Sequence, residues 1–125
     1  MVTKRILLVD DEEELLEAMK IRLVSWGYDV VTATTGEEAV LLAKEKNKPL
    51  DAIILDIMMP GIGGIEALRQ IRAFNKKLPV FILTAYSSEE SFKEAETLGI
   101  SGYIPKGSEF ANASEAIRVV LKGAA

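Results

Sequence analysis

The sequence contains neither cysteine nor histidine among its 125 residues. Without cysteine, the chain forms no disulfides, thiolate nucleophiles, iron–sulfur clusters or cysteine-type zinc sites. Without histidine, it lacks the commonest general base and the commonest ligand of transition metals. Any chemistry that the chain performs must therefore use carboxylates, hydroxyl groups, lysine, arginine or the backbone.

An excess of basic charge and long apolar runs are missing as well. Fifteen lysine and arginine residues stand against nineteen aspartate and glutamate residues, and the net charge of −4 disfavours a nucleic-acid surface. Asp10 ends the N-terminal apolar run of residues 6–9, so that run is neither a membrane span nor a secretion signal. We therefore expect a cytoplasmic protein without nucleic-acid or membrane partners, and the length predicts one domain over residues 1–125.

The hydrophobic pattern alternates between two periods along the chain. Short runs rich in branched residues predict five strands, at residues 5–9, 29–33, 52–55, 80–83 and 102–104. The first, third and fourth runs are apolar almost throughout, which is typical of parallel strands that are covered on both faces. The longer segments between the strands have helical spacing, and the last predicted helix includes both Phe110 and Leu121. This alternation predicts an α/β protein of five β–α units, a doubly wound parallel sheet with helices on both faces.

Helix starts are marked by two further patterns. Thr35 to Glu38 and Ser87 to Glu90 both have the composition of a capping box, in which a hydroxyl and a glutamate bind backbone amides of the first turn. They predict helices that begin shortly after the second and fourth strands.

Charged and hydroxyl side chains follow four of the five predicted strands, at the edge where ligands bind in such sheets. They are Asp10, Asp11, Asp56, Thr84 and Lys106. Three carboxylates brought together repel one another unless a cation balances them, and a hard divalent ion such as Mg²⁺ suits an open carboxylate site. An aspartate beside such an ion can attack a phosphoryl group, while a lysine and a hydroxyl hold its oxygens. The cluster therefore indicates phosphoryl-transfer chemistry.

Each of these residues also has a simpler explanation when it is taken alone. An aspartate pair before a helix is often only a helix cap, and a single surface lysine or threonine usually has no special role. Their joint placement at the strand ends of one sheet favours a site. Asp51 provides a contrast, because it precedes Asp56 by roughly 16 Å at ~3.3 Å per residue and is expected at the opposite edge of the sheet.

The segments that carry these residues resemble the bacterial response-regulator receiver domain, the CheY-like family. They are Leu8 to Glu12, Asp56 to Gly61, Thr84-Ala85, and Tyr103 to Lys106. The resemblance spans almost the whole chain, and the order and spacing of the segments are specific. It implies a flavodoxin-like (βα)5 fold with strand order 2-1-3-4-5, in a phosphoacceptor domain of two-component signal transduction.

The resemblance also implies a phosphoacceptor and a metal site. Asp56 would accept a phosphoryl group from a phosphohistidine on a histidine kinase or a histidine phosphotransfer protein. Asp11, Asp56 and the backbone carbonyl of Met58 would bind Mg²⁺, or Mn²⁺ in its place, and Asp10 would contribute through a water molecule. No other cofactor is implied.

Lys106 and Thr84 would hold the phosphoryl oxygens, according to the same resemblance. Thr84 would move toward the phosphoryl group, and Tyr103 would turn inward to fill the space beneath it. The face built from the fourth helix, the fifth strand and the fifth helix would then present a changed surface to a downstream target. The protein would be a monomer or a phosphorylation-dependent homodimer, and it would catalyse only its own phosphorylation and slow dephosphorylation.

One feature differs from the family pattern, and a second bears on the lifetime of the phosphoryl group. The family often has proline after the conserved lysine, whereas this chain has Pro105 before Lys106 and the conformationally free Gly107 after it. In the family, the positions two residues after the phosphoacceptor and two after the conserved threonine flank the route of the hydrolytic water. Here these are the bulky Met58 and Tyr86, so we predict a long-lived phosphoryl-aspartate.

Three alternatives remain open from the sequence. A degenerate receiver, acting only as a phosphorylation-independent binding module, is favoured by Gly107 and disfavoured by the retention of all five site residues. An aspartate-based phosphatase typically has a second aspartate two residues after the first, where this chain has Met58. A flavodoxin-like FMN protein needs a hydroxyl- and glycine-rich loop after the first strand, where acidic residues 10–14 would repel phosphate.

Overall fold

Five parallel strands form one sheet in the order β2-β1-β3-β4-β5. The computed structural model describes residues 3–85 and 89–123. The strands are β1 (Arg5–Val9), β2 (Asp29–Ala33), β3 (Ala52–Asp56), β4 (Val80–Thr84) and β5 (Gly102–Pro105). The predicted α/β class and the strand order implied by the resemblance are both confirmed.

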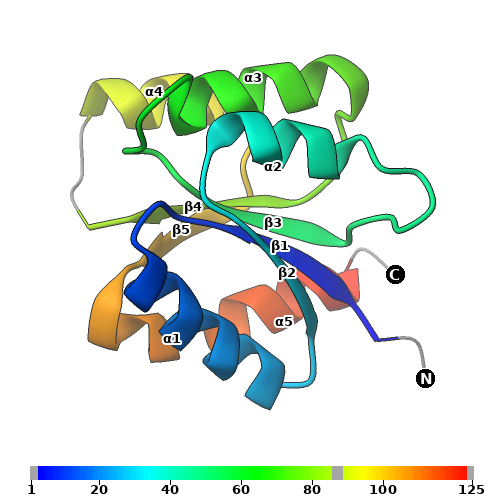
Figure 1. Ribbon diagram of the computed structural model, residues 1–125, viewed down its shortest axis with the longest axis vertical. Helices are drawn as coiled ribbons and strands as arrows, with labels where there is room; N and C mark the ends of the chain where they lie inside the picture. Colours follow the sequence, from blue (N-terminus) through cyan, green and yellow to red (C-terminus); the bar gives the residue numbers. More distant parts are fainter. Residues whose placement is uncertain (1–2, 86–88, 124–125) are drawn as a thin grey trace.

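Helices cover both faces of the sheet, as Figure 1 shows. The helices α2 (Gly36–Ala43), α3 (Gly63–Phe74) and α4 (Glu89–Thr97) lie on one face. The other face carries α1 (Glu13–Ser25), the 3-10 helix η1 (Gly107–Ala113) and α5 (Ser114–Gly123). No helix in the described part of the chain is long and apolar enough to cross a membrane.

The central strands are buried on both faces, which explains why their sequences are apolar without alternation. In β1, Leu7 and Val9 pack into the cluster beneath α2 and α3, whereas Ile6 and Leu8 pack into the cluster against α1 and α5. Successive side chains of a strand point to opposite faces, so β1, β3 and β4 each contribute to both clusters. The two layers of core hold the carboxyl ends of the strands in a fixed register.

The element boundaries differ from the predicted ones at the ends of three strands and within the last helix. Strands β3, β4 and β5 each run one residue further than predicted, so Asp56 and Thr84 are the last residues of their strands. The predicted last helix is divided between η1 and α5. The buried positions explain this division, because Phe110 and Ala113 are three residues apart, as in a 3-10 turn, and Ile117 follows at the α-helical spacing of four.

One of the two predicted capping boxes lies within the described residues. The Thr35 hydroxyl accepts a hydrogen bond of 3.1 Å from the amide of Glu38, as predicted. The carboxylate of Glu38 reaches back by one residue more than in the usual box and accepts a 2.8 Å hydrogen bond from the amide of Thr34. The second box, Ser87 to Glu90, begins outside the described residues, as does Tyr86.

Candidate functional site

Asp10 and Asp56 lie side by side at the carboxyl edge of the sheet. The register pairs Val9 of β1 with Leu55 of β3, which places the next residue of each strand at the same level. Asp10 is held there by its amide, which donates to the carbonyl of Ala33 at the end of β2. Their exposed fractions are 0% and 1%, so both carboxyl groups are buried. Buried acidic groups require hydrogen-bond or ionic partners.

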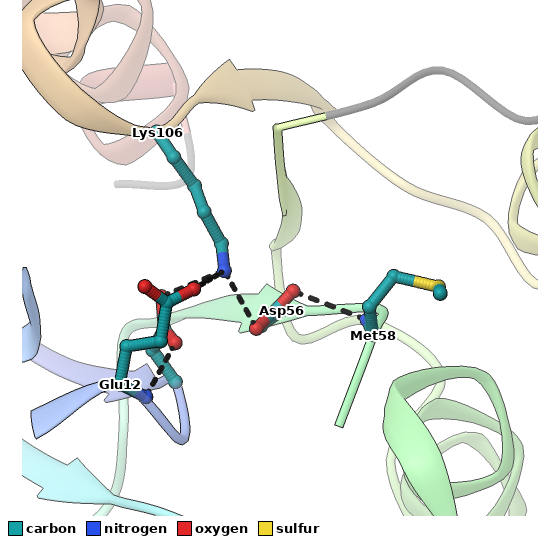
Figure 2. Close-up of polar contacts among 5 residues, drawn as sticks. Glu12, Asp56, Met58 and Lys106 are labelled. Atoms are coloured by element: carbon teal, nitrogen blue, oxygen red, sulfur yellow. Dashed lines mark hydrogen bonds and ion pairs between the residues drawn. The ribbon is translucent and has the colours of Figure 1, made fainter. Parts of the chain in front are cut away.

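Lys106 supplies the positive charge. Its amide donates to the carbonyl of Thr84, which fixes the start of its side chain beside the end of β4. From there its Nζ reaches Asp56 Oδ2 at 2.9 Å and Asp10 Oδ2 at 3.2 Å. Figure 2 shows the ammonium group between the carboxylates of Glu12 and Asp56, and Glu12 Oε1 lies 3.3 Å from Nζ. One lysine therefore contacts acidic groups at the carboxyl ends of two different strands, β1 and β3.

Backbone amides hold the remaining carboxylate oxygens. Asp56 Oδ1 accepts from the amide of Met58 at 3.1 Å, and Asp10 Oδ1 accepts from the amide of Glu12 at 2.9 Å. The Met58 side chain points away from Asp56 in Figure 2 and is 70% exposed. Each buried carboxylate is thus oriented by the first turn of the loop that follows its own strand.

Burial and charge set the protonation of this cluster. Burial raises the pKa of Asp56 and the neighbouring Asp10 adds to this rise, whereas the hydrogen bond from Lys106 opposes it, and the net result is a pKa of about 6. Burial by itself lowers the pKa of Lys106, but the hydrogen bond and charge of Asp56, with the charge of Asp10, outweigh it and hold that pKa above its usual value. The ammonium therefore stays charged, while the Asp56 carboxyl titrates just below neutral pH.

Asp10, Asp11 and Asp56 form a group that fits a hard divalent cation. One carboxylate oxygen from each lies within 4.8 Å of the others, and Asp11 is the exposed member. Asp10 Oδ2 is buried and has no hydrogen-bond partner among the described residues, although it lies near the Lys106 ammonium. Carboxylate oxygens on a partly open edge are the donors that Mg²⁺ takes in proteins, with water in its other positions. The residues present therefore suit Mg²⁺.

Neither Asp10 nor Asp11 is the N-cap residue of the following helix, α1, which was the simpler explanation of this aspartate pair. Helix α1 begins at Glu13 with Glu12 as its N-cap residue, and Asp10 contacts this turn through the amide of Glu12. Asp51 lies at the opposite edge, where its Oδ2 accepts a 2.7 Å hydrogen bond from the amide of Arg5. The prediction that Asp51 stands outside the site is confirmed.

Thr84 and Tyr103 lie on the two strands beyond Asp56. Thr84 ends β4 and pairs with Pro105 of β5. Tyr103 is directed outward: its side chain is 38% exposed, and its hydroxyl donates a 2.9 Å hydrogen bond to Glu96 Oε1 of α4. Burial raises the pKa of the Tyr103 phenol, and the hydrogen bond to Glu96 and the charge of Glu96 raise it as well. The structure therefore holds Tyr103 in an outward position.

The loop after Lys106 is built around Gly107, which has a φ of 80°. Proline is locked near −65°, so this backbone cannot accommodate the Lys-Pro junction of the family pattern. Gly107 instead opens the 3-10 helix η1, whose Phe110 stacks on Trp26 of the chain just after α1, with ring centroids 5.9 Å apart. The replacement of the family proline by Gly107 therefore changes the backbone of this loop but leaves Lys106 at the site.

Sequence reasoning missed two contributions to the site. One is Glu12, whose carboxylate approaches Lys106; the signal for it in the sequence is that it directly follows two site aspartates. The other is Gly64. A Cβ at Gly64 would stand 2.0 Å from the carbonyl oxygen of Asp56, so this close approach of α3 to the end of β3 requires glycine. Nothing local in the sequence marks that contact.

Comparison with known proteins identifies the family of this α/β domain. Residues 6–118 match the family described as "Response regulator receiver domain". The chain belongs to the receiver domains of response regulators, which act in two-component systems and interact with kinases and downstream effectors. Receiver domains generally bind Mg²⁺ at an acidic aspartate cluster, and such a group is present here.

Individual relatives agree with this assignment. The chain is 36% identical over 121 residues, 97% of its length, to the alkaline phosphatase synthesis transcriptional regulatory protein PhoP of Bacillus subtilis, of which it covers 50%. Among solved structures it resembles a LuxR-family two-component response regulator from Aurantimonas, with 36% identity, a TM-score of 0.83, and coverage of 98% of this chain and 87% of that one.

A second solved structure is the receiver domain of the sensor histidine kinase PA1611 from Pseudomonas aeruginosa. The two chains are 27% identical, with a TM-score of 0.85 and coverage of 97% and 99%, and that protein holds a magnesium ion in its active-site cleft. The present chain spans half or less of the first curated relatives that it matches.

Proposed function

We propose that this domain is a phosphorylation switch in which Asp56 accepts a phosphoryl group from a phosphohistidine of a histidine kinase or phosphotransfer protein. An Asp56 oxygen forms a bond to phosphorus as the phosphorus–nitrogen bond of the donor breaks. The observation that carries this proposal is the buried Asp56 carboxylate held between the Lys106 ammonium and the amide of Met58. A carboxylate oriented in this way is placed to act as a nucleophile.

A divalent ion at the aspartate group would supply positive charge beside the transferred phosphoryl oxygens. We propose that Asp11, Asp56 and the Met58 carbonyl hold Mg²⁺, or Mn²⁺ in its place, with Asp10 acting through water. The cluster of carboxylate oxygens within 4.8 Å supports the aspartate part of this set. The Met58 carbonyl stays a prediction.

Lys106 and Thr84 are proposed to receive the new negative charge. The Lys106 ammonium is already directed at Asp56, and its contacts with Asp10 and Glu12 would hold it within reach when the Asp56 carboxylate becomes an acyl phosphate. Thr84 ends the neighbouring strand, and its carbonyl accepts a hydrogen bond from the amide of Lys106, which places the two residues side by side.

The proposed readout is Tyr103. In its outward position, its hydroxyl donates a hydrogen bond to Glu96, which joins β5 to α4. Movement of Thr84 toward the phosphoryl group would open space that the ring can enter, at the cost of that hydrogen bond, about 1 kcal/mol. The face of α4, β5 and α5 would then present a different surface to a downstream target protein. A homodimer formed on phosphorylation would use the same face.

Intact-mass measurement tests the chemical step. The protein is incubated with acetyl phosphate and MgCl₂, and we expect a gain of about 80 Da. EDTA and the Asp56→Asn variant should abolish the gain, whereas Asp51→Asn, on the same strand segment but at the opposite edge, should retain it. Retention of the gain in Asp56→Asn would overturn the assignment of the nucleophile. No gain in the wild type, with Mg²⁺ present, would favour the alternative of a binding-only receiver.

A further inference from the structure

A hollow lies on the opposite edge of the sheet from the aspartate cluster. It has a volume of about 610 Å³ and lies between the ends of α2 and α3 and the loops that follow them. We call it the lysine-rimmed pocket, defined by Lys44, Lys46, Pro49, Leu50, Phe74 and Leu78. In Figure 1 the α2–β3 loop projects on the right, away from the strand ends that carry the site.

The floor of the pocket is apolar and partly open to solvent. Phe74 is 41% exposed although it is one of the largest apolar side chains of α3. Leu50 and Leu78 line the same space, and the Lys44 ammonium lies 5.6 Å from the centre of the Phe74 ring. A hollow of this volume is large enough for a bulky side chain and its neighbours.

The rim is basic in a protein that is acidic as a whole. A second hollow of about 330 Å³ shares Glu45 and Leu50 with the first one and adds Arg5 and Lys48. Together, the residues that line the two hollows include four basic side chains and one acidic one, whereas the net charge of the chain is −4. The lining of the two hollows therefore has a local excess of basic charge, next to the exposed ring of Phe74.

The wall formed by the end of α3 is held in place. Arg72 donates to the carbonyls of Leu98 and Gly99 after α4, at 2.8 Å and 2.6 Å, and to the carbonyl of Asn75 at 3.1 Å. The Asn75 side chain accepts from the amides of Lys77 and Leu78 and closes the turn. A pocket with braced walls costs little ordering when a ligand enters it.

We infer that the lysine-rimmed pocket docks an acidic segment of a partner protein that carries a bulky apolar residue. The apolar residue would enter against Phe74, and the flanking carboxylates would pair with Lys44, Lys46 and Lys48. A short segment fits better than a second folded copy, because stable interfaces use about 20–30 residues on each side and these hollows offer far fewer. This surface is separate from the aspartate cluster and from the α4–β5–α5 face.

The inference can be tested on the intact domain with a designed probe. The probe is a short fluorescein-labelled peptide in which glutamates flank a tryptophan and a leucine; one comparison peptide replaces glutamate with lysine, and another replaces the apolar residues with serine. Fluorescence anisotropy measures affinity, and amide chemical shifts locate the site. We expect the acidic apolar peptide to bind best, to shift amides of residues 43–50 and 74–78, and to weaken as salt rises.

Charge reversal supplies the matched variants. The double variant Lys44→Glu, Lys46→Glu should weaken binding roughly tenfold, whereas Lys122→Glu, an exposed lysine of α5, should leave it unchanged. Equal binding by all variants, shifts confined to other surfaces, or no binding would overturn the inference. Concentration-dependent dimerisation that Lys44→Glu, Lys46→Glu abolishes would overturn it in favour of a second copy.

Discussion

Replacing Asp56 by asparagine is expected to stabilise the metal-free protein at neutral pH, although it removes the partner of Lys106. The folded state raises the pKa of Asp56 from 3.8 to about 6, and this net rise already includes the attraction to Lys106. Ionising Asp56 in the folded chain therefore costs about 3 kcal/mol relative to the unfolded chain, at ~1.36 kcal/mol per pH unit. A neutral isostere avoids that cost.

The sign follows from the direction of the change. Because the pKa is raised on folding, the favourable contribution of the protonated carboxyl is complete below pH 3.8 and is lost as the pH rises to about 6. At pH 7.5 the asparagine variant should gain about 3 kcal/mol, equivalent to roughly 10 °C in melting temperature for a chain of this size. At pH 4.5 the gain should shrink to about 1 kcal/mol.

Urea unfolding of both proteins in EDTA at the two pH values measures this difference. Asp29→Asn, an exposed aspartate at the opposite end of the sheet, is the control and should change stability by less than about 0.5 kcal/mol at either pH. Adding Mg²⁺ should narrow the gap by stabilising the wild type alone. The reasoning is refuted if Asp56→Asn is no more stable at pH 7.5, or if its advantage is the same at pH 4.5.

Three further predictions concern the surroundings of the site. Gly64→Ala should destabilise the protein by at least about 2 kcal/mol in urea unfolding, because its Cβ would overlap a strand carbonyl, while Gly102→Ala, which meets only ordinary contacts, should cost about 1 kcal/mol or less. Met58→Asn should speed loss of the phosphoryl group in a decay assay; an unchanged rate in that variant and in Tyr86→Glu would contradict a long-lived phosphoryl-aspartate. Tyr103→Phe, which loses the hydroxyl bond to α4, should shift the ring inward before phosphorylation, and unaltered ring chemical shifts would argue against the proposed readout.

Much of the fold could be predicted because its signals are local. Uninterrupted apolar runs identified the central strands, and the residue that follows each run identified the edge of the sheet. Asp10 and Asp56 could be placed on the same edge for this reason alone, since the parallel strands of a sheet share one carboxyl edge. The strand order depended on the resemblance, because periodicity does not say which strands are neighbours.

Contacts that depend on the path of the backbone could not be predicted. The reach of Glu12 to Lys106 joins residues 94 positions apart, and no local pattern encodes it. The closeness of Gly64 to the carbonyl of Asp56 depends on how α3 returns to the sheet. The division of the last predicted helix into η1 and α5 follows a change in the spacing of its buried residues from three to four. A search for a single helical period treats both spacings as one helix.

Lys106 has a consequence beyond charge balance. It follows the edge strand β5, and its side chain crosses the end of β4 to reach the acidic groups after β3 and β1. Its ion pairs therefore link the outermost strand to the central strands across the carboxyl edge of the sheet. A new partner for this ammonium would therefore act on the end of β5, the strand that also carries Tyr103.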